Sequence, residues 1–75
     1  MAQNVILRIK KSLIAVIEEG ISKRQIKPQT ESNKIAEIMI SLVEGGFMMA
    51  KLLDEKEYFE NSLKQLEEII KGLKV

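Results

Sequence analysis

The sequence predicts an all-α domain of three helices, and three observations support this prediction. Apolar residues recur at the 3.6-residue spacing of a helix in three separate segments. The single proline, Pro28, lies in a polar stretch between the first two segments. The 75 residues are 45% hydrophobic and include no cysteine. Because a chain of this length buries only a small core, we expect oligomerisation, not disulfides, to reinforce it.

The first helix is expected over about residues 3–21. Gly20 either closes this helix as a C-terminal cap or lies one turn before its end. Lys10 falls inside the apolar arc, where its ammonium group is expected to extend to solvent. Contact of Lys10 with an acidic effector or with another domain is the alternative. The main apolar face of the helix consists of Ile6, Ile9, Leu13, Val16, Ile17 and Gly20.

A polar connection over residues 22–30 precedes the second helix, because Pro28 disfavours helical backbone at Lys27 and has no N–H to donate. The second helix is expected over about residues 32–53, with capping residues clustered at positions 30–33. Its apolar residues cover more than half of its circumference, which is too much for one helical neighbour. It is therefore expected to pack against its own chain on one side and against a second chain on the other.

Gly45 and Gly46 lie in the middle of the most hydrophobic segment. Since a glycine within a helix costs about 1 kcal/mol relative to alanine, this pair either breaks the helix or allows close contact with another helix. The apolar stripe keeps its phase across the pair, with Leu42, Gly46, Met49 and Leu53 on one face. We therefore expect a continuous helix, with the close contact at or near a dimer interface.

The third helix is expected over about residues 55–71, with Asp54 as its N-cap and Gly72 at its end. Its apolar residues follow alternating steps of four and three, which is typical of a bundle or coiled-coil seam. These residues are Phe59, Leu63, Leu66, Ile70 and Leu73. The second and third helices are expected to form an antiparallel hairpin, with the first helix packed across it.

The composition argues against several classes of function. Twelve basic and eleven acidic residues give a net charge of +1, without the clustered basic face that nucleic-acid binding requires. Without cysteine or histidine, a zinc or copper site is not expected. Adjacent carboxylates such as Glu18 and Glu19 point about 100° apart on a helix, so they do not converge on one substrate atom. We therefore expect neither enzyme activity nor a cofactor.

The hydrophobic segments are also too short for a membrane span. Glu44 and Lys51 interrupt the longest apolar run, which stays below the ~20 residues that a span needs. The first residues do not have the pattern of a signal peptide. A cytoplasmic protein without a membrane partner is expected.

Four short motifs occur in order along the chain: Glu19-Gly20, Ile26-Lys27-Pro28, Glu44-Gly45-Gly46 and Asp54-x-x-x-Tyr58. A helix ending in Glu-Gly, a loop with Ile-x-Pro, a long helix with a small-residue centre and an acidic junction before a final amphipathic helix follow one another. In this order, from about Ile6 to Leu73, the chain resembles the C-terminal domain of TetR/AcrR-type transcriptional regulators.

The resemblance implies that the second and third helices pair with their copies in a second subunit as a four-helix bundle. It also implies that the preceding helices help to enclose an effector pocket, and that an N-terminal helix-turn-helix domain binds the operator. This sequence contains no helix-turn-helix segment. We therefore expect a C-terminal fragment of a larger regulator, without DNA-binding residues of its own and with ligand-binding residues that the sequence does not identify. A small apolar effector is the further partner expected of the full-length protein.

The predicted homodimer interface contains nine residues. They are Ile38, Leu42, Gly45, Gly46 and Met49 from the second helix, and Phe59, Leu63, Leu66 and Ile70 from the third. The predicted function is dimerisation and partial effector binding in a TetR-like regulator. The alternative is a stand-alone small helical protein that associates with itself or with a partner and has no role in transcription.

Overall fold

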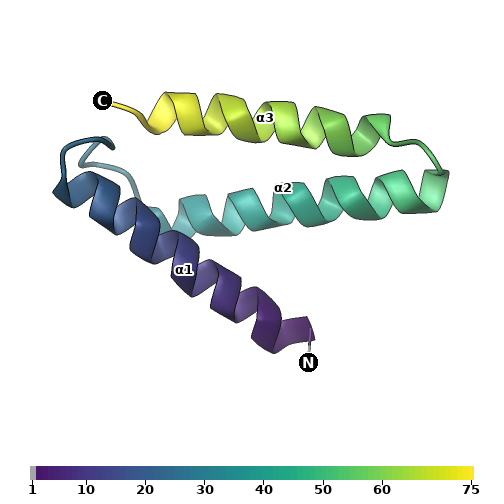
Figure 1. Ribbon diagram of the computed structural model, residues 1–75, viewed down its shortest axis with the longest axis horizontal. Helices are drawn as coiled ribbons and strands as arrows, with labels where there is room; N and C mark the ends of the chain where they lie inside the picture. The colour runs from purple at the N-terminus through teal and green to yellow at the C-terminus, as the bar shows by residue number, and fades with distance from the viewer. Residues whose placement is uncertain (1) are drawn as a thin grey trace.

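The computed structural model describes residues 2–75, which form three helices (Figure 1). Helix α1 spans Ala2–Ser22, α2 spans Ser32–Leu53 and α3 spans Glu57–Leu73. Helices α2 and α3 lie side by side as an antiparallel hairpin, as Figure 1 shows. The predicted all-α class and the hairpin of the second and third helices are therefore confirmed.

Helix α1 packs against α2 and then diverges from the hairpin toward its N-terminal end (Figure 1). Within the described residues, no Cα atom of α1 comes within 8 Å of a Cα atom of α3. The expectation that the first helix packs across both helices of the hairpin is therefore wrong for the described residues, because the backbone of α1 closely approaches that of α2 alone. Its divergence leaves the N-terminal half of α1 exposed, including Val5, Leu7 and Ile9.

Helix α1 runs through Gly20 and ends at Ser22, so Gly20 lies within the last turn and does not cap it. A Cβ atom added at Gly20 would lie 2.5 Å from Cδ1 of Ile26, which shows that the loop folds back directly onto this glycine. Arg24 adopts left-handed backbone (φ 61°), and Gln25 and Ile26 then donate their N–H groups to the Gly20 carbonyl at 2.8 and 3.1 Å. These bonds satisfy a carbonyl at the helix end.

The C-terminal residues are paired with the α1–α2 loop. Lys27 donates its N–H to the Leu73 carbonyl at 2.9 Å, and Val75 donates to the Gln25 carbonyl at 3.2 Å. Together they form one antiparallel bridge between Ile26 and Lys74. This bridge connects the end of α3 to the loop beside α1, although no Cα atom of α1 in the described residues lies within 8 Å of one in α3.

Helix α2 ends at Leu53 because Asp54 takes left-handed backbone (φ 53°, ψ 42°) and its N–H bonds to the Ala50 carbonyl. Aspartate tolerates this conformation better than most residues. The predicted role of Asp54 as N-cap of the third helix is therefore wrong. Helix α3 begins at Glu57, after Lys56, without a side-chain cap, and it continues through Gly72 to Leu73.

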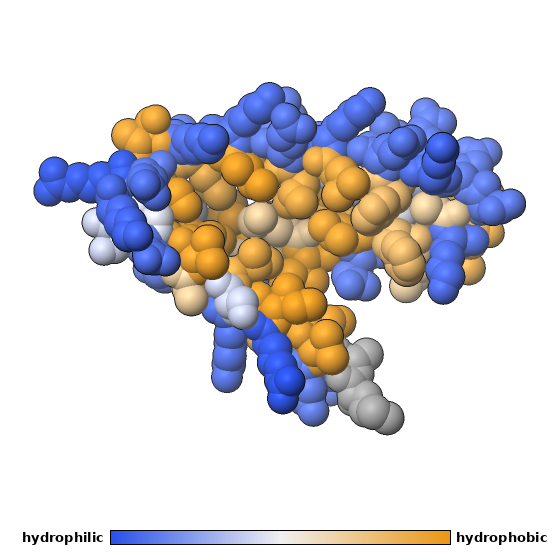
Figure 2. Space-filling model, in the orientation of Figure 1, coloured by the Kyte–Doolittle hydropathy of each residue, from blue (hydrophilic) through white to orange (hydrophobic). Residues whose placement is uncertain are grey.

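The three helices form a flat slab. Its Cα atoms extend 41 × 29 × 13 Å, so one dimension is less than half of either of the others. The radius of gyration is 13.5 Å, against about 11 Å for a compact domain of this length. Figure 2 shows one flat face of the slab, where apolar side chains form a band between the polar outer edge of α3 and α1.

Candidate interaction surfaces

The hairpin closes through a direct contact between Gly46 in α2 and Ser62 in α3. A Cβ atom added at Gly46 would overlap the Ser62 side chain, lying 2.6 Å from its Cβ, and would lie 3.3 Å from the Tyr58 carbonyl oxygen. The Ser62 hydroxyl donates to that same carbonyl at 3.1 Å. Helix α2 is continuous across Gly45 and Gly46, as predicted. The close contact that Gly46 allows lies inside the chain.

An aromatic pair joins the two helices near the tip of the hairpin. The rings of Phe47 and Phe59 meet edge to face, with centroids 6.0 Å apart and planes at 78°. This geometry is favourable for aromatic pairs. The Lys51 ammonium lies 5.6 Å from the centroid of the Phe47 ring, a favourable cation–π distance. Phe47 nevertheless remains 52% exposed.

The contact between α1 and α2 contains the best-buried side chains of the structure. Ile17 is 4% exposed and Ala36 is fully buried. Beside them, the buried Ser32 donates its hydroxyl to Oε1 of Glu18 at 2.5 Å. Ser32 therefore uses its hydroxyl to join two helices, and the N-cap position of α2 belongs to Glu31.

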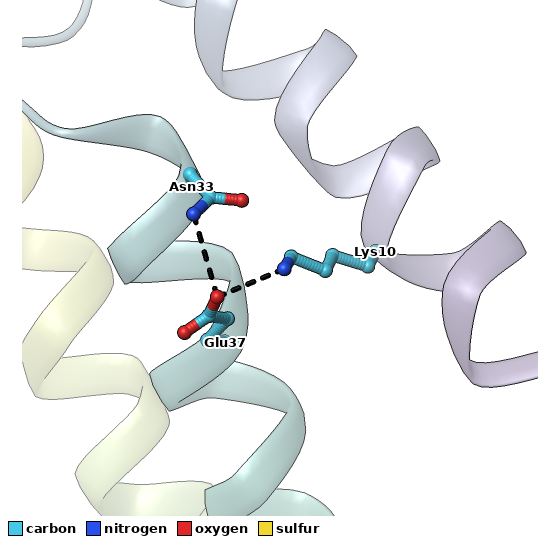
Figure 3. A network of polar contacts seen from close by, with 3 residues as sticks. All are labelled: Lys10, Asn33 and Glu37. Atoms are coloured by element: carbon cyan, nitrogen blue, oxygen red, sulfur yellow. Dashed lines mark hydrogen bonds and ion pairs between the residues drawn. The ribbon is translucent and has the colours of Figure 1, made fainter. Parts of the chain in front are cut away.

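A second polar contact between α1 and α2 involves three residues (Figure 3). The Lys10 ammonium lies 2.8 Å from Oε1 of Glu37, and the Asn33 side-chain amide donates to the same oxygen at 3.3 Å. The hydrogen bond and positive charge of Lys10 lower the pKa of Glu37 below its usual value. The expectation that Lys10 extends freely to solvent is wrong, since its partner is a carboxylate of the next helix.

A shallow apolar trough lies between α1 and the C-terminal half of α3. Its volume is about 750 Å³, and its walls include Leu13, Val16, Met39, Ile70 and Leu73. A smaller hollow of about 210 Å³ continues from Leu13 and Met39 toward Val43 and Leu66. No polypeptide in the described structure covers the trough.

A separate hollow of about 400 Å³ lies on the other side of the hairpin. Residues of α2 that line it include Leu42, Gly45, Gly46 and Met49, and residues of α3 include Tyr58, Asn61, Ser62 and Gln65. On α2, Gly45 of this hollow and Val43 of the smaller hollow point about 160° apart at 100° per residue. The slab therefore presents two different faces, one mainly apolar, with Arg24, Gln25 and Lys74 also lining its trough, and one with polar side chains along α3.

The structure divides the nine residues of the predicted dimer interface between these two sides. Leu42, Gly45, Gly46 and Met49 line the hollow beside Ser62, and Ile38 is 50% exposed on the same side of α2. Three of the four α3 residues instead line other depressions: Phe59 near the tip, Leu66 in the middle and Ile70 in the trough. Leu63 is 43% exposed. The nine-residue interface stays a prediction.

Sequence reasoning missed several residues that organise these surfaces. Glu37 and Glu18 join α1 to α2, but their partners lie 27 and 14 residues away in sequence, and no local pattern predicts such pairs. Leu52, by contrast, lies seven residues after Gly45 and is 77% exposed. Its helical spacing was a sufficient signal to place it on the same side as Gly45 and Ile38.

Neither a metal site nor a membrane-spanning helix is found over residues 2–75. No three acidic side chains in that range are grouped closely enough to hold a metal ion. None of α1, α2 and α3 combines the length and the apolar character that crossing a membrane requires.

Comparison with known proteins identifies a matching family and a similar solved structure. The family model described as "Tetracyclin repressor-like, C-terminal domain" matches residues 1–66. The crystal structure of a TetR-family transcriptional regulator from Cytophaga hutchinsonii superimposes with a TM-score of 0.91 at 35% sequence identity. The superposition covers 99% of this chain and 37% of that protein, so the chain spans little more than a third of the regulator's length. Among curated proteins, none matches.

The family match covers most of the chain, and the structural match covers nearly all of it. The TM-score of 0.91 shows that this chain and the matched part of the regulator share one fold. The chain belongs to the family of tetracycline-repressor-like C-terminal domains.

Proposed function

We propose that this chain is the dimerisation region, and part of the effector-binding wall, of a TetR-like transcriptional regulator. The observation that supports dimerisation most directly is the amount of surface left uncovered. The accessible area is 5921 Å², whereas a compact folded monomer of 8.5 kDa exposes about 4,700 Å². The excess of roughly 1,200 Å² is larger than the ~800 Å² that each partner contributes to a standard interface.

The uncovered surface of α2 and α3 also contains large apolar side chains. Side chains such as Ile38, Met49, Leu63 and Ile70 are between 39% and 50% exposed. Contiguous exposed apolar surface of this kind marks interaction sites in proteins. Since the slab has two such faces, the homodimer covers one of them, and the remainder of the regulator covers the other.

The trough between α1 and α3 supports the effector-binding part of the proposal. Most of its lining is apolar, including Leu13, Val16, Met39 and Ile70, although Arg24, Gln25 and Lys74 also line it; such a mainly apolar surface suits an apolar small molecule. This region supplies only one wall, because the trough is open. The near-neutral charge of +1 supports the further proposal that this part of the protein does not bind operator DNA by itself.

The experiment is multi-angle light scattering over a concentration series, with far-UV circular dichroism on the same samples. A helical species of twice the 8.5 kDa chain mass is expected at micromolar concentrations. A helical monomer up to the highest soluble concentration would contradict the dimerisation proposal. In a parallel gel-shift assay, the chain is expected to leave duplex DNA unshifted, and a salt-dependent shift would contradict the DNA proposal.

A further inference from the structure

The outer side of α2 around Gly45 is uncharged and has no partner in the chain. Ile38, Ser41, Gly45, Met49 and Leu52 follow one another at intervals of three or four residues, so they share one side of the helix. All five are exposed, and the large ones strongly so: Ile38 is 50%, Met49 46% and Leu52 77% exposed. We call these five residues the Gly45 face.

Gly45 itself has no explanation within the chain. Its backbone φ is not positive, so the conformation does not require glycine, and glycine disfavours a helix relative to alanine. A Cβ atom added at Gly45 would meet nothing within 4 Å, in contrast to Gly46, which is pressed against Ser62. The missing side chain creates a gap on the helix surface that a second helix can enter.

We propose that the Gly45 face binds the same face of a second copy, with the two α2 helices antiparallel and a twofold axis at Gly45. This inference rests on the homodimer proposed above and specifies which of the two faces forms it. An antiparallel pair centred on residue 45 places Ile38 opposite Leu52 of the second copy. It also places the small Ser41 opposite the large Met49.

The spacing of the face identifies a second copy as the occupant. A twofold contact must be self-complementary, because each residue meets its counterpart across the axis. The Gly45 face meets this condition: apolar residues lie seven positions on either side of Gly45, and one small and one large residue lie four positions on either side. The nearest charged residue on this side of α2 is Lys34, eleven positions from Gly45, so like charges do not meet at the axis.

The area of uncovered surface agrees with this occupant. Each copy exposes more surface than a compact monomer of its mass by an amount exceeding one side of a standard interface. The hollow of about 400 Å³ beside Gly45 and Met49 provides the concave part of such a contact. The trough on the other side, lined in part by Ile70 and Leu73, is left for the remainder of the regulator.

Disulfide trapping tests the register directly, because the chain contains no cysteine. Ser41→Cys and Met49→Cys are prepared separately and oxidised alone or after mixing. In the proposed register, two copies of residue 41 lie eight residues apart along the helix axis, about 12 Å, which is too far for a disulfide. Residue 41 of one copy lies opposite residue 49 of the other, so the mixture is expected to form a covalent heterodimer at least tenfold faster than either variant alone.

Light scattering on the same variants separates failure of the register from failure of the dimer. If the mixed variants form a dimer by mass but give no heterodimeric disulfide, the Gly45 register is wrong while the homodimer stands. Rapid disulfide formation by Ser41→Cys alone would indicate a different register and would likewise overturn the proposal. If all variants and the parent chain are helical monomers, both the proposed function and this inference are wrong. Leu63→Cys serves as a probe of the other side and is expected to stay reduced.

A bulky side chain gives an independent test. Gly45→Leu is expected to weaken dimerisation at least tenfold without changing helicity, because nothing within the chain contacts that position. Gly72→Leu is the matched control, since Gly72 is also helical and has open space around it. Equal dimer affinities for Gly45→Leu and the parent chain would overturn the proposal.

Discussion

Gly46 of α2 lies so close to Ser62 of α3 that no other amino acid fits at position 46 without movement of one helix. An added Cβ would lie 2.6 Å from the Ser62 Cβ and 3.3 Å from the Tyr58 carbonyl oxygen. The second of these neighbours is backbone, which does not rotate away as a side-chain tip would. The contact therefore sets the separation of the two hairpin helices.

Gly46→Ala is expected to destabilise the protein in spite of the higher helix propensity of alanine. The gain of about 1 kcal/mol from propensity is opposed by overpacking of about 1–3 kcal/mol, so the net change is a loss of up to about 2 kcal/mol. Urea unfolding followed by circular dichroism measures it. The double variant Gly46→Ala/Ser62→Gly is the control, because removal of the Ser62 Cβ makes room for the new methyl group. If the two substitutions were simply additive, the contact would not be the cause.

Ser32→Ala is expected to lower the free energy of unfolding by about 1–2 kcal/mol. Ser32 is only 8% exposed and donates its hydroxyl to the Glu18 carboxylate, and hydrogen bonds to charged groups contribute more than neutral ones. Ser12→Ala on the exposed side of α1 is the control and should remain within about 0.5 kcal/mol of the parent. Equal effects of the two substitutions would show that the hydroxyl contributes nothing.

The contact between Lys10 and Glu37 predicts a dependence of stability on pH. Because the pKa of Glu37 is lowered in the folded state, chiefly by the Lys10 hydrogen bond and charge, the folded protein favours the ionised form. The resulting stabilisation is complete above the ordinary glutamate pKa and is lost as the pH falls through the lowered value. The difference in unfolding free energy between the parent and Glu37→Gln should therefore shrink below about pH 4.5.

An NMR titration of the Glu37 carboxyl carbon tests the cause of this shift. Lys10→Met should raise the pKa of Glu37 toward its usual value, because both the hydrogen bond and the nearby charge are removed. Lys11→Met removes an equal charge from the adjacent position of α1, which points about 100° away, and should shift it less. An equal shift in both variants would mean that only the net charge matters.

Val75→Pro is expected to destabilise the C-terminal bridge by about 1 kcal/mol, since proline cannot donate the hydrogen bond to the Gln25 carbonyl. Lys74 already has the extended backbone (φ −68°, ψ 142°) that a residue before proline requires. Val75→Ala keeps the N–H and is the control. The amide of Lys27, bonded to the Leu73 carbonyl, should exchange its hydrogen faster in Val75→Pro but not in Val75→Ala.

The helices themselves were predictable because their determinants are local. Apolar spacing and the position of Pro28 placed three segments that the structure confirms, and the phase of the stripe across Gly45 and Gly46 correctly predicted a continuous helix. The helix ends were less predictable. Aspartate suits both an N-cap and a left-handed C-terminal residue, and in the structure Asp54 ends α2 while Lys56 precedes α3.

Residue types and their spacing were enough to predict the helical class, the order of the hairpin helices and the excess of apolar surface, since each depends on local pattern. The neighbour of each residue, in contrast, became known from the packing of the helices. In the structure, Gly46 packs against Ser62, whereas nothing lies within 4 Å of a Cβ atom added at Gly45. Lys10 forms an ion pair with Glu37. The packing also separates Leu42 and Met49 from Leu66 and Ile70. The physical reason is that a helical wheel gives the direction of a side chain relative to its own helix, whereas its partner depends on how the helices cross.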